Sequence, residues 1–393
     1  MKNKIGRRDF LGKSGKVLLA AGLSRLVPAA PVFAAVPSGR NPSDYFVLPA
    51  TPNVIEEAPA RIVEEGRIKL GFFRAPVREM NLSEARILKS WPRSFPEFIG
   101  YGITHPDWYF GTIIIDPKMF PFISSIYAYD RRSGRLFSHD RLAFGRRGQV
   151  AKNTWNGESF VVESDFMIRF RHRLEDGYHE ISIDIPKDHG KPALKADLKM
   201  TLDLNYFQPL TVSMLVEPRF WGYTQKALLP ISGEMTIGSE KIVFDPRRDL
   251  AALDESRNLT PFRYGWTWGT GADFDERGGI RGINAGIRTE VADGERWNEN
   301  CAWFDGKISL LGDVTWDLDP ANPKKPWRLK DKRGRLDLEY YPEGKKSIGS
   351  RSIGAGYFQT CGQYEGTLQD ESGRSHSLKS CYGVAEQGMM GWP

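Results

Sequence analysis

The stretch IRGINAGIRTEVADGERWNENCAWFDGKISLLGDVTW, residues 280–316, decides the fold that we expect for this chain. It contains two Asp-Gly pairs, Asp293-Gly294 and Asp305-Gly306, and apolar and polar residues alternate around each pair. Asp-Gly between alternating runs is the strongest short-range signal for a β-hairpin. We therefore predict a meander of three antiparallel strands in this stretch.

The register of the meander follows if both pairs are two-residue turns. Glu299 then lies opposite Arg288 in one hairpin and opposite Gly312 in the other, and the same rule pairs Asn284 with Trp303 and Cys301 with Leu310. One face combines mainly apolar side chains with an Arg, a Glu and an Asn: Asn284, Gly286, Arg288, Trp297, Glu299, Cys301, Trp303, Ile308, Leu310, Gly312 and Val314. A slip of one residue would move this whole set to the other face of the sheet.

Short alternating runs continue over most of the chain from about residue 66. Residues 160–174 and 198–205 alternate cleanly between apolar and polar side chains, as half-buried antiparallel strands do. Asn156-Gly157 and Asp176-Gly177 indicate further hairpins, and only residues 249–257 are expected to form a short helix. We predict an all-β protein with two consecutive antiparallel domains, 66–245 and 246–393, each with enough strands to curl into a β-barrel.

Residues 1–34 resemble an export signal. Arg7-Arg8 opens a twin-arginine pattern, an apolar run follows at 17–23, and small residues end at Ala34, where we expect cleavage. We therefore expect recognition by the twin-arginine export machinery and a periplasmic location. Residues 35–65, rich in Pro and Ala, are expected to form a tether, although residues 45–48 are apolar enough to pack.

The net charge of +6 gives no indication of a nucleic-acid partner. The export segment holds seven of the 55 basic residues and one of the 49 acidic residues, so charges balance in the rest of the chain. No basic stripe with interleaved aromatic residues is present either. Oligomeric state has no signal in the sequence.

The chain has three cysteines, so they cannot all pair with one another. Cys361 and Cys381 flank the expected turn at 370–373 and would form a disulfide if the strand register brings their side chains together. Cys301 lies on the apolar face of the meander and is expected to be a buried thiol.

Several motifs together resemble the domain of unknown function 2804 family. They are the aromatic runs Trp108-Tyr109-Phe110 and Tyr264–Trp268, then Asn284 with Glu299-Asn300, and finally residues 364–366 and 383–386. More distantly, the chain resembles the group of carotenoid 1,2-hydratase (hydroxyneurosporene synthase), tocopherol cyclase and Diels-Alder cyclases. This resemblance implies two lipocalin-like (calycin) β-barrels side by side.

Most familiar chemistry has no motif in this sequence. It lacks a Walker loop, a nucleophile elbow and a dinucleotide fingerprint, so we expect no cofactor. His172 and His179 fall diagonally across the expected Asp176-Gly177 turn but have no obvious third ligand, so exposed or cross-strand paired histidines are the preferred interpretation and no metal site is expected. His105 lies at the expected start of a strand. It is either a functional residue or a turn residue that hydrogen-bonds to the local backbone.

Glu299 is the carboxylate that the register places among tryptophans. A buried carboxylate needs a partner, and Arg288 is directly opposite. The pair is either a structural pin that fixes the barrel's register, or the polar part of a cavity in which Arg288 and Asn284 orient a ligand.

The distant resemblance implies an enzyme hypothesis. A carboxylic acid would protonate an isoprenoid double bond, and tryptophans would stabilise the resulting cation. Glu299 would need a raised pKa for this role, yet a neighbouring arginine lowers it. Asp305 is a weaker acid candidate because we expect it to be engaged in the Asp305-Gly306 turn. The candidate catalytic residues are Glu299, Glu386 and His105, and the candidate ligand-binding residues are Asn284, Arg288, Asn300, Trp108, Tyr109, Trp266, Trp268, Trp297 and Trp303.

Two other functions fit the same residues. Tryptophan faces stack on sugar rings and paired acids cleave glycosides, so a carbohydrate-active or carbohydrate-binding protein is one alternative. A non-catalytic lipocalin-like lipid binder is the other. In the hydratase or cyclase hypothesis and in the lipid-binder hypothesis, the partner is a small hydrophobic or amphipathic ligand.

Overall fold

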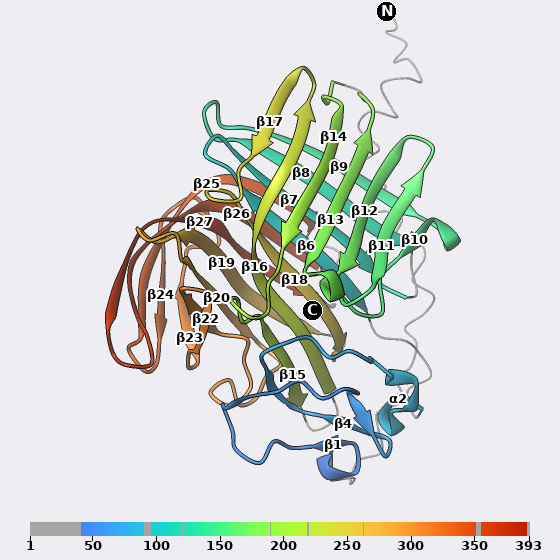
Figure 1. Ribbon diagram of the computed structural model, residues 1–393, viewed down its shortest axis with the longest axis vertical. Helices are drawn as coiled ribbons and strands as arrows, with labels where there is room; N and C mark the ends of the chain where they lie inside the picture. The colour runs from blue at the N-terminus through green and yellow to red at the C-terminus, as the bar shows by residue number, and fades with distance from the viewer. Residues whose placement is uncertain are drawn as a thin grey trace, which may run out of the picture.

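The computed structural model describes residues 41–89, 96–118, 121–188, 190–217, 220–261, 263–350 and 355–390. Figure 1 shows two large β-sheets, with short N-terminal strands beside one end of the first. The predicted export segment, 1–34, and residues 35–40 lie outside the described residues. In the described part, no helix has both the length and the apolar character needed to cross a membrane.

The first sheet has fifteen strands. Its main path runs in the order β10 (Gly148–Gln149), β11 (Gly157–Glu163), β12 (Phe166–Arg173), β13 (Tyr178–Ile185), β14 (Leu194–Thr201), β16 (Phe220–Ile237), β18 (Leu250–Leu259), β6 (Glu97–Thr104), β7 (Trp108–Asp116), β8 (Phe122–Asp130) and β9 (Arg135–Ala143). Off this path lie β2 (Ile55–Glu56), β5 (Gly71–Phe73), β15 (Leu210–Glu217) and β17 (Glu240–Phe244). Burial alternates strictly along β12 and β14, as the sequence predicted.

The second sheet has nine antiparallel strands. Their order is β22 (Lys307–Leu310), β21 (Cys301–Phe304), β20 (Ile280–Arg288), β19 (Tyr264–Phe274), β27 (Ser375–Met390), β26 (Ala355–Gln369), β25 (Leu336–Ser350), β24 (Trp327–Asp331) and β23 (Val314–Asp317). The predicted fold class is therefore confirmed: the protein is nearly all β, with two consecutive sheets of the lipocalin-like barrel type.

The ends of the first sheet approach each other, as they do in a barrel. Arg141 on β9 lies 3.4 Å from Glu163 on β11 and 3.0 Å from Asp165 just after it. These ion pairs join strands that stand at opposite ends of the hydrogen-bonded path. The sheet is therefore strongly curled and almost closed.

Helical structure is short in the described residues. It comprises η1 (Pro42–Asp44), η2 (Leu82–Glu84), η3 (Gly145–Arg147), η4 (Leu174–Asp176) and α2 (Arg86–Lys89). The helix predicted at 249–257 is wrong, because this segment is strand β18 and pairs with both β16 and β6. Its charges misled the prediction because Glu255 and Arg257 are buried against each other instead of facing solvent. The change of sheet falls between Leu259 and Tyr264, later than the expected boundary at 245.

The segment that we expected to be a tether has structure from Asn41 onward. Phe46 and the neighbouring Tyr45 are buried, and β1 (Phe46–Val47) joins β4 (Arg67–Lys69) and β3 (Val63–Glu64) in a three-stranded sheet. Residues further on reach the first sheet, where the backbone N–H of Val77 donates to the Tyr223 hydroxyl at 3.2 Å. Within the expected tether, the main core includes Tyr45, Phe46, Ile62 and Val63.

One of the two Asp-Gly turns has the predicted form. Asp305 and Gly306 have φ values of 49° and 71°, as a type I′ turn requires, and Cys301 pairs with Leu310 as predicted. The other prediction is wrong, because residues 289–300 form a loop in which the N–H of Trp297 donates to the carbonyl oxygen of Asp293. Asn284 consequently pairs with Cys301 and not with Trp303.

This two-residue shift leaves the predicted apolar face intact, since side chains alternate with a period of two. Trp297, Cys301, Trp303, Ile308 and Leu310 all belong to one apolar cluster, which continues into the first sheet. The Trp303 ring stacks on Phe207 at 5.7 Å, and its N–H donates to the carbonyl oxygen of Gln208. The hairpin therefore joins the two sheets.

All three cysteines are free and buried. Cys361 pairs with Val384, whereas Cys381 pairs with Tyr364. Their side chains lie in different apolar clusters. A disulfide between Cys361 and Cys381 therefore does not form.

A candidate acid site between the two sheets

Strands β19, β27 and β26 present one face of the second sheet to the first. The register places Trp268 opposite Glu386 and Glu386 opposite Gln359. The next row on this face consists of Trp266, Gly388 and Tyr357. On the other side, the Tyr127 hydroxyl of β8 donates a hydrogen bond to Gln359 Oε1. The face therefore forms one wall of the junction between the sheets.

Glu386 is at the centre of this face and receives three hydrogen bonds. Trp266 Nε1 donates to Oε1 at 2.8 Å, while the Tyr357 hydroxyl (2.8 Å) and Gln359 Nε2 (2.6 Å) donate to Oε2. Burial raises the pKa of the Glu386 carboxyl to about 7, although the three donors act in the opposite direction. Glu386 is a half-buried residue, and a carboxyl with this pKa is about half protonated at neutral pH.

Gly388 allows the Trp266 ring to take this position. A Cβ atom on Gly388 would lie 2.1 Å from Cζ2 of Trp266, far inside contact distance, so the indole lies across the backbone of β27. Tyr264 stacks on the same indole at 5.8 Å, and Tyr357 lies 6.2 Å away at an angle of 34°. Aromatic side chains thus adjoin both oxygens of the Glu386 carboxyl, with Trp266 at Oε1 and Tyr357 at Oε2.

A buried lysine holds two further carboxylates beside the site. Lys226 Nζ lies 2.6 Å from Asp254 Oδ1 and 3.3 Å from Glu299 Oε2, and it stands 4.8 Å from the Trp268 ring. Burial opposes the charge of Lys226, but the two carboxylates outweigh it and raise its pKa. Burial also raises the pKa of Asp254. Two carboxylates share one cation here, so the cluster carries excess negative charge near Glu386.

The predicted ion pair between Arg288 and Glu299 is wrong. Arg288 Nη2 lies 2.7 Å from Glu290 Oε1, and its Nη1 donates to Asn258, whereas Glu299 pairs with Lys226. The cause is the loop at 289–300, which removes the tight turn that would have set these two residues opposite each other.

The two predicted asparagines bind protein groups. Asn284 Oδ1 accepts from Trp268 Nε1 at 3.0 Å, and its Nδ2 donates to the carbonyl oxygen of Glu299 at 2.6 Å. Asn300 accepts from the Gly286 N–H and donates to the Gly312 carbonyl oxygen. Asn284 therefore orients Trp268 at the site, while Asn300 fixes the loop backbone.

Four of the other predicted residues lie away from Glu386. Trp297 stacks on Phe72 and Trp303 on Phe207 in the main core. Trp108 Nε1 donates to Glu240 at 3.1 Å. His105 Nδ1 accepts from the Asp107 N–H at 3.1 Å, so its local structure is that of a turn residue.

Tyr109 does approach the site. It belongs to the apolar cluster that contains Trp268 and against which Trp266 packs, and its ring lies 5.9 Å from Tyr382. A narrow recess of about 10 Å³ lies between the sheets beside Tyr109, Tyr382 and Thr270. This volume is enough for about one water molecule.

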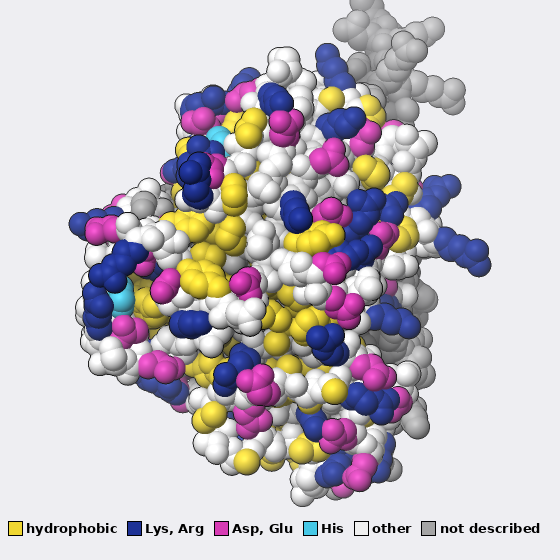
Figure 2. All heavy atoms as spheres, in the orientation of Figure 1, with side chains coloured by type: hydrophobic (Ala, Val, Ile, Leu, Met, Phe, Trp, Pro, Cys, Tyr) yellow, Lys and Arg dark blue, Asp and Glu magenta, His cyan; other side chains and the backbone are white. Residues whose placement is uncertain are grey.

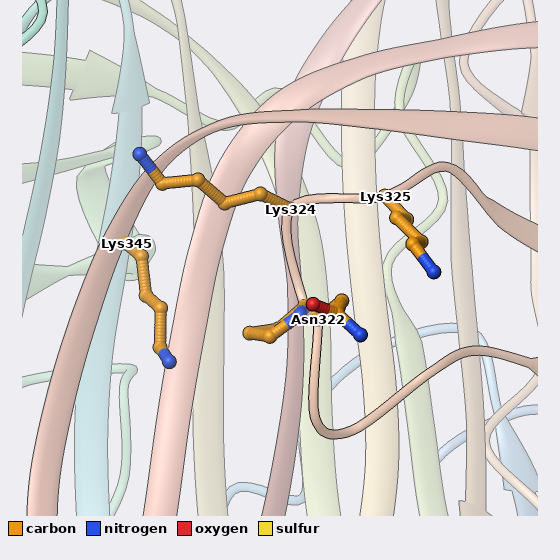
Figure 3. Close-up of a pocket in the computed structure, with 5 residues that line it drawn as sticks. Asn322, Lys324, Lys325 and Lys345 are labelled. Carbon is orange, nitrogen blue, oxygen red and sulfur yellow. The ribbon is translucent and has the colours of Figure 1, made fainter.

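Figure 2 shows hydrophobic side chains gathered near the middle of the molecule, around β19, β26 and β27. A larger hollow of about 430 Å³ lies elsewhere, on the second sheet, and Figure 3 shows Lys324, Lys325 and Lys345 extending in different directions. It is lined by Asn322, Pro323, Lys324, Lys325 and Lys345. None of these side chains is an acid, and Lys325 already pairs with Asp319 at 3.2 Å. We therefore place the candidate site at Glu386.

The family comparison agrees with the expectation from the motifs. The model of the domain of unknown function DUF2804 matches residues 54–392. The chain belongs to the DUF2804 family. No curated protein matches this DUF2804 chain by sequence.

Solved structures similar to this DUF2804 protein include CghA with Sch210972, at a TM-score of 0.49 and 12% identity, covering 76% of this chain and 89% of that chain. Kievitone hydratase from Nectria haematococca has a TM-score of 0.44 at 12% identity, covering 76% of this chain and 89% of that chain.

Proposed function

We propose that this DUF2804 protein is a cofactor-independent hydratase or cyclase that protonates a carbon–carbon double bond of an apolar, isoprenoid-type substrate, with Glu386 as the acid. The observation that carries the proposal is the raised pKa of Glu386, a half-buried residue whose carboxyl pKa reaches about 7 through burial beside Trp266 and Tyr357. General acids work best when their pKa lies near the working pH.

The hydrogen bonds indicate which oxygen delivers the proton. Oε2 of Glu386 accepts from Tyr357 and Gln359, whereas Oε1 accepts from Trp266 alone. The proton therefore belongs on Oε1, where a lone pair is free and the substrate would approach beside the indole. After transfer, the three donors stabilise the carboxylate that remains.

Proton transfer to one carbon of the double bond leaves a cation on the other. The face of a tryptophan attracts a cation more strongly than other aromatic rings do, and Trp266 touches the carboxyl that donates the proton. Water ends the reaction in a hydratase, and an internal nucleophile ends it in a cyclase. In both cases the substrate or the water returns a proton to Glu386.

Glu299 does not serve as this acid in the proposal. Its carboxylate is engaged in an ion pair with Lys226 at 3.3 Å. The Lys226 cluster has another effect, because the charge of Asp254 adds to the factors that raise the pKa of Glu386. Lys226, Asp254 and Glu299 are therefore positioning residues.

The test combines ligand identification with isotope incorporation. Mass spectrometry of an organic extract identifies the bound molecule, and incubation of candidate substrates in D₂O follows the new C–D bond that protonation by Glu386 must form. Glu386→Gln should abolish incorporation, whereas Glu234→Gln, at an exposed position of β16, should not. A bound glycan would favour the carbohydrate alternative, and an unaltered bound lipid without deuterium incorporation would favour the lipid binder.

A further inference from the structure

Three side chains form a row inside the first sheet, whereas Glu386 lies on β27 of the second sheet. His172 on β12 lies directly opposite His179 on β13, and His179 lies directly opposite Met200 on β14. All three are fully buried. Side chains directly opposite each other on one face have Cβ atoms about 4.5–5.5 Å apart, so the imidazoles and the thioether are close neighbours.

This arrangement differs from the diagonal one that the sequence predicted. The turn between the histidines comprises η4 and Gly177, which has φ 78°, and is longer than a two-residue Asp-Gly turn. The imidazole centroids are 5.5 Å apart and the ring planes meet at 72°.

The imidazoles have nitrogens that lack hydrogen-bond partners. His172 Nε2 contacts the Ser159 hydroxyl at 3.1 Å. In the part of the chain that the structure describes, His172 Nδ1 and both ring nitrogens of His179 have no partner. A buried polar group without a partner costs about 1–3 kcal/mol. Three such atoms on adjacent rings indicate that a ligand completes the site.

The available donors limit the kind of ligand. The described residues contain no group of three or more His, Cys, Asp or Glu arranged to hold a metal ion, so a site of the usual zinc type is excluded there. Two imidazoles with a thioether are a soft donor set, which suits Cu(I). The positive charges of Arg257 and Arg173 also act on His172, and a monovalent ion adds less positive charge than a divalent one.

We propose that His172, His179 and Met200 form a binding site for Cu(I) within the first barrel, separate from the acid site. The site lies at the end of the barrel that the turn closes, because both histidines flank η4. Loop residues cover this end, with the N–H of Leu174 bonded to the Thr154 carbonyl oxygen and that of Glu175 to the Trp155 carbonyl oxygen.

Anaerobic titration of the full chain with Cu(I), in competition with a chromophoric Cu(I) chelator, tests the proposal. We expect one ion per chain, and Met200→Leu and His179→Phe should each weaken binding by at least about tenfold. His105→Asn, at the turn between β6 and β7, should leave the affinity unchanged. Zn(II) should not compete. Thermal unfolding without metal checks that each variant is folded.

X-ray absorption at the copper edge distinguishes this site from the three buried cysteines. Two nitrogen neighbours and one sulfur neighbour are expected. A shell of sulfur alone would overturn the proposal, as would wild-type affinity in both Met200→Leu and His179→Phe, or no binding to the wild-type chain.

Discussion

Glu386 couples the proposed reaction to pH. Because its carboxyl must be protonated to act as the acid and its pKa is about 7, turnover should fall about tenfold per pH unit above neutrality. A pH profile of kcat measures this loss. Glu386→Gln has no proton to donate, so its residual rate should be low and should lack this inflection. An inflection near 7 that survives in Glu386→Gln would assign the pH dependence to another group.

The same pKa also predicts how stability depends on pH. The folded state holds the Glu386 proton up to about pH 7, whereas the ordinary pKa is 4.5. The folded state therefore binds more protons at Glu386 between these values, so the contribution of Glu386 to stability should be fully present below about pH 4.5 and should decline up to pH 7. The total effect is at most about 3 kcal/mol, and partial exposure reduces it. Chemical denaturation at several pH values should show a smaller decline for Glu386→Gln.

Gly388 offers a test of the tryptophan position that leaves the acid in place. In Gly388→Ala the new Cβ would meet the Trp266 ring at 2.1 Å, so the indole must move away from Glu386. Activity should fall by at least about tenfold, and tryptophan emission should change. Gly356→Ala is the matched control, because a Cβ atom there meets nothing within 4 Å. Equal activity in both variants would mean that Trp266 does not support the reaction.

The sequence indicated Glu386, Trp266 and Trp268 as candidate residues, but it gave no sign of Gln359, which bonds Glu386 in the structure. Counting back from the turn at 370–373, where Gln369 pairs with Ser375, would place Gln359 opposite Ala385. A β-bulge between Tyr364 and Gly366 shifts the register by one residue and sets Gln359 opposite Glu386 instead. A shift of one residue exchanges the faces of a strand, and no local pattern indicated it.

At the scale of elements, the two Asp-Gly pairs show what local signals can decide. Asp305-Gly306 formed the predicted turn because the runs that flank it pair directly. Asp293-Gly294 lies in a loop whose shape depends on distant groups, such as Lys226 bound to Glu299 and Arg333 bound to Glu295 at 2.5 Å. The alternation of the sequence therefore located the strand faces correctly but misplaced the partners of Arg288 and Glu299.

The Lys226 cluster ties β16 and β18 of the first sheet to the loop before β21 of the second. In Lys226→Met, Asp254 and Glu299 lose their shared cation while still partly buried. Removing one partner of such a group typically costs about 3–5 kcal/mol. Lys241→Met removes an exposed pair with Glu234 and should cost about 1 kcal/mol or less. Urea denaturation compares the two variants, and equal losses would contradict the structural role of Lys226.

For the whole molecule, alternation was sufficient to predict the fold class, because nearly every long run became a strand. The N-terminal segment was harder to interpret, since its Pro and Ala content gave no sign that Tyr45 and Phe46 enter the main core. The extent of the first domain was also underestimated, because the charged residues of β18 pair inside the barrel.

We also propose export of the whole protein by the twin-arginine route, on the basis of Arg7 and Arg8. Replacing both by lysine should trap the precursor inside the cell, and fractionation with N-terminal sequencing measures this. The wild-type chain should begin at Ala35 in the periplasm. Normal export of the double variant, or an intact N-terminus on periplasmic protein, would contradict the proposal.

The apolar cluster shared by both sheets has a consequence for synthesis on the ribosome. Strand β18 ends the first sheet at Leu259, yet Phe207, in the loop between β14 and β15, is covered by Trp303, and Leu228 on β16 is covered by the backbone around Gly282. At about 5–20 residues per second, the nascent chain carries this apolar surface uncovered for seconds before the hairpin emerges. A truncated chain that ends after β18 would keep it uncovered permanently and would depend on chaperones to stay in solution.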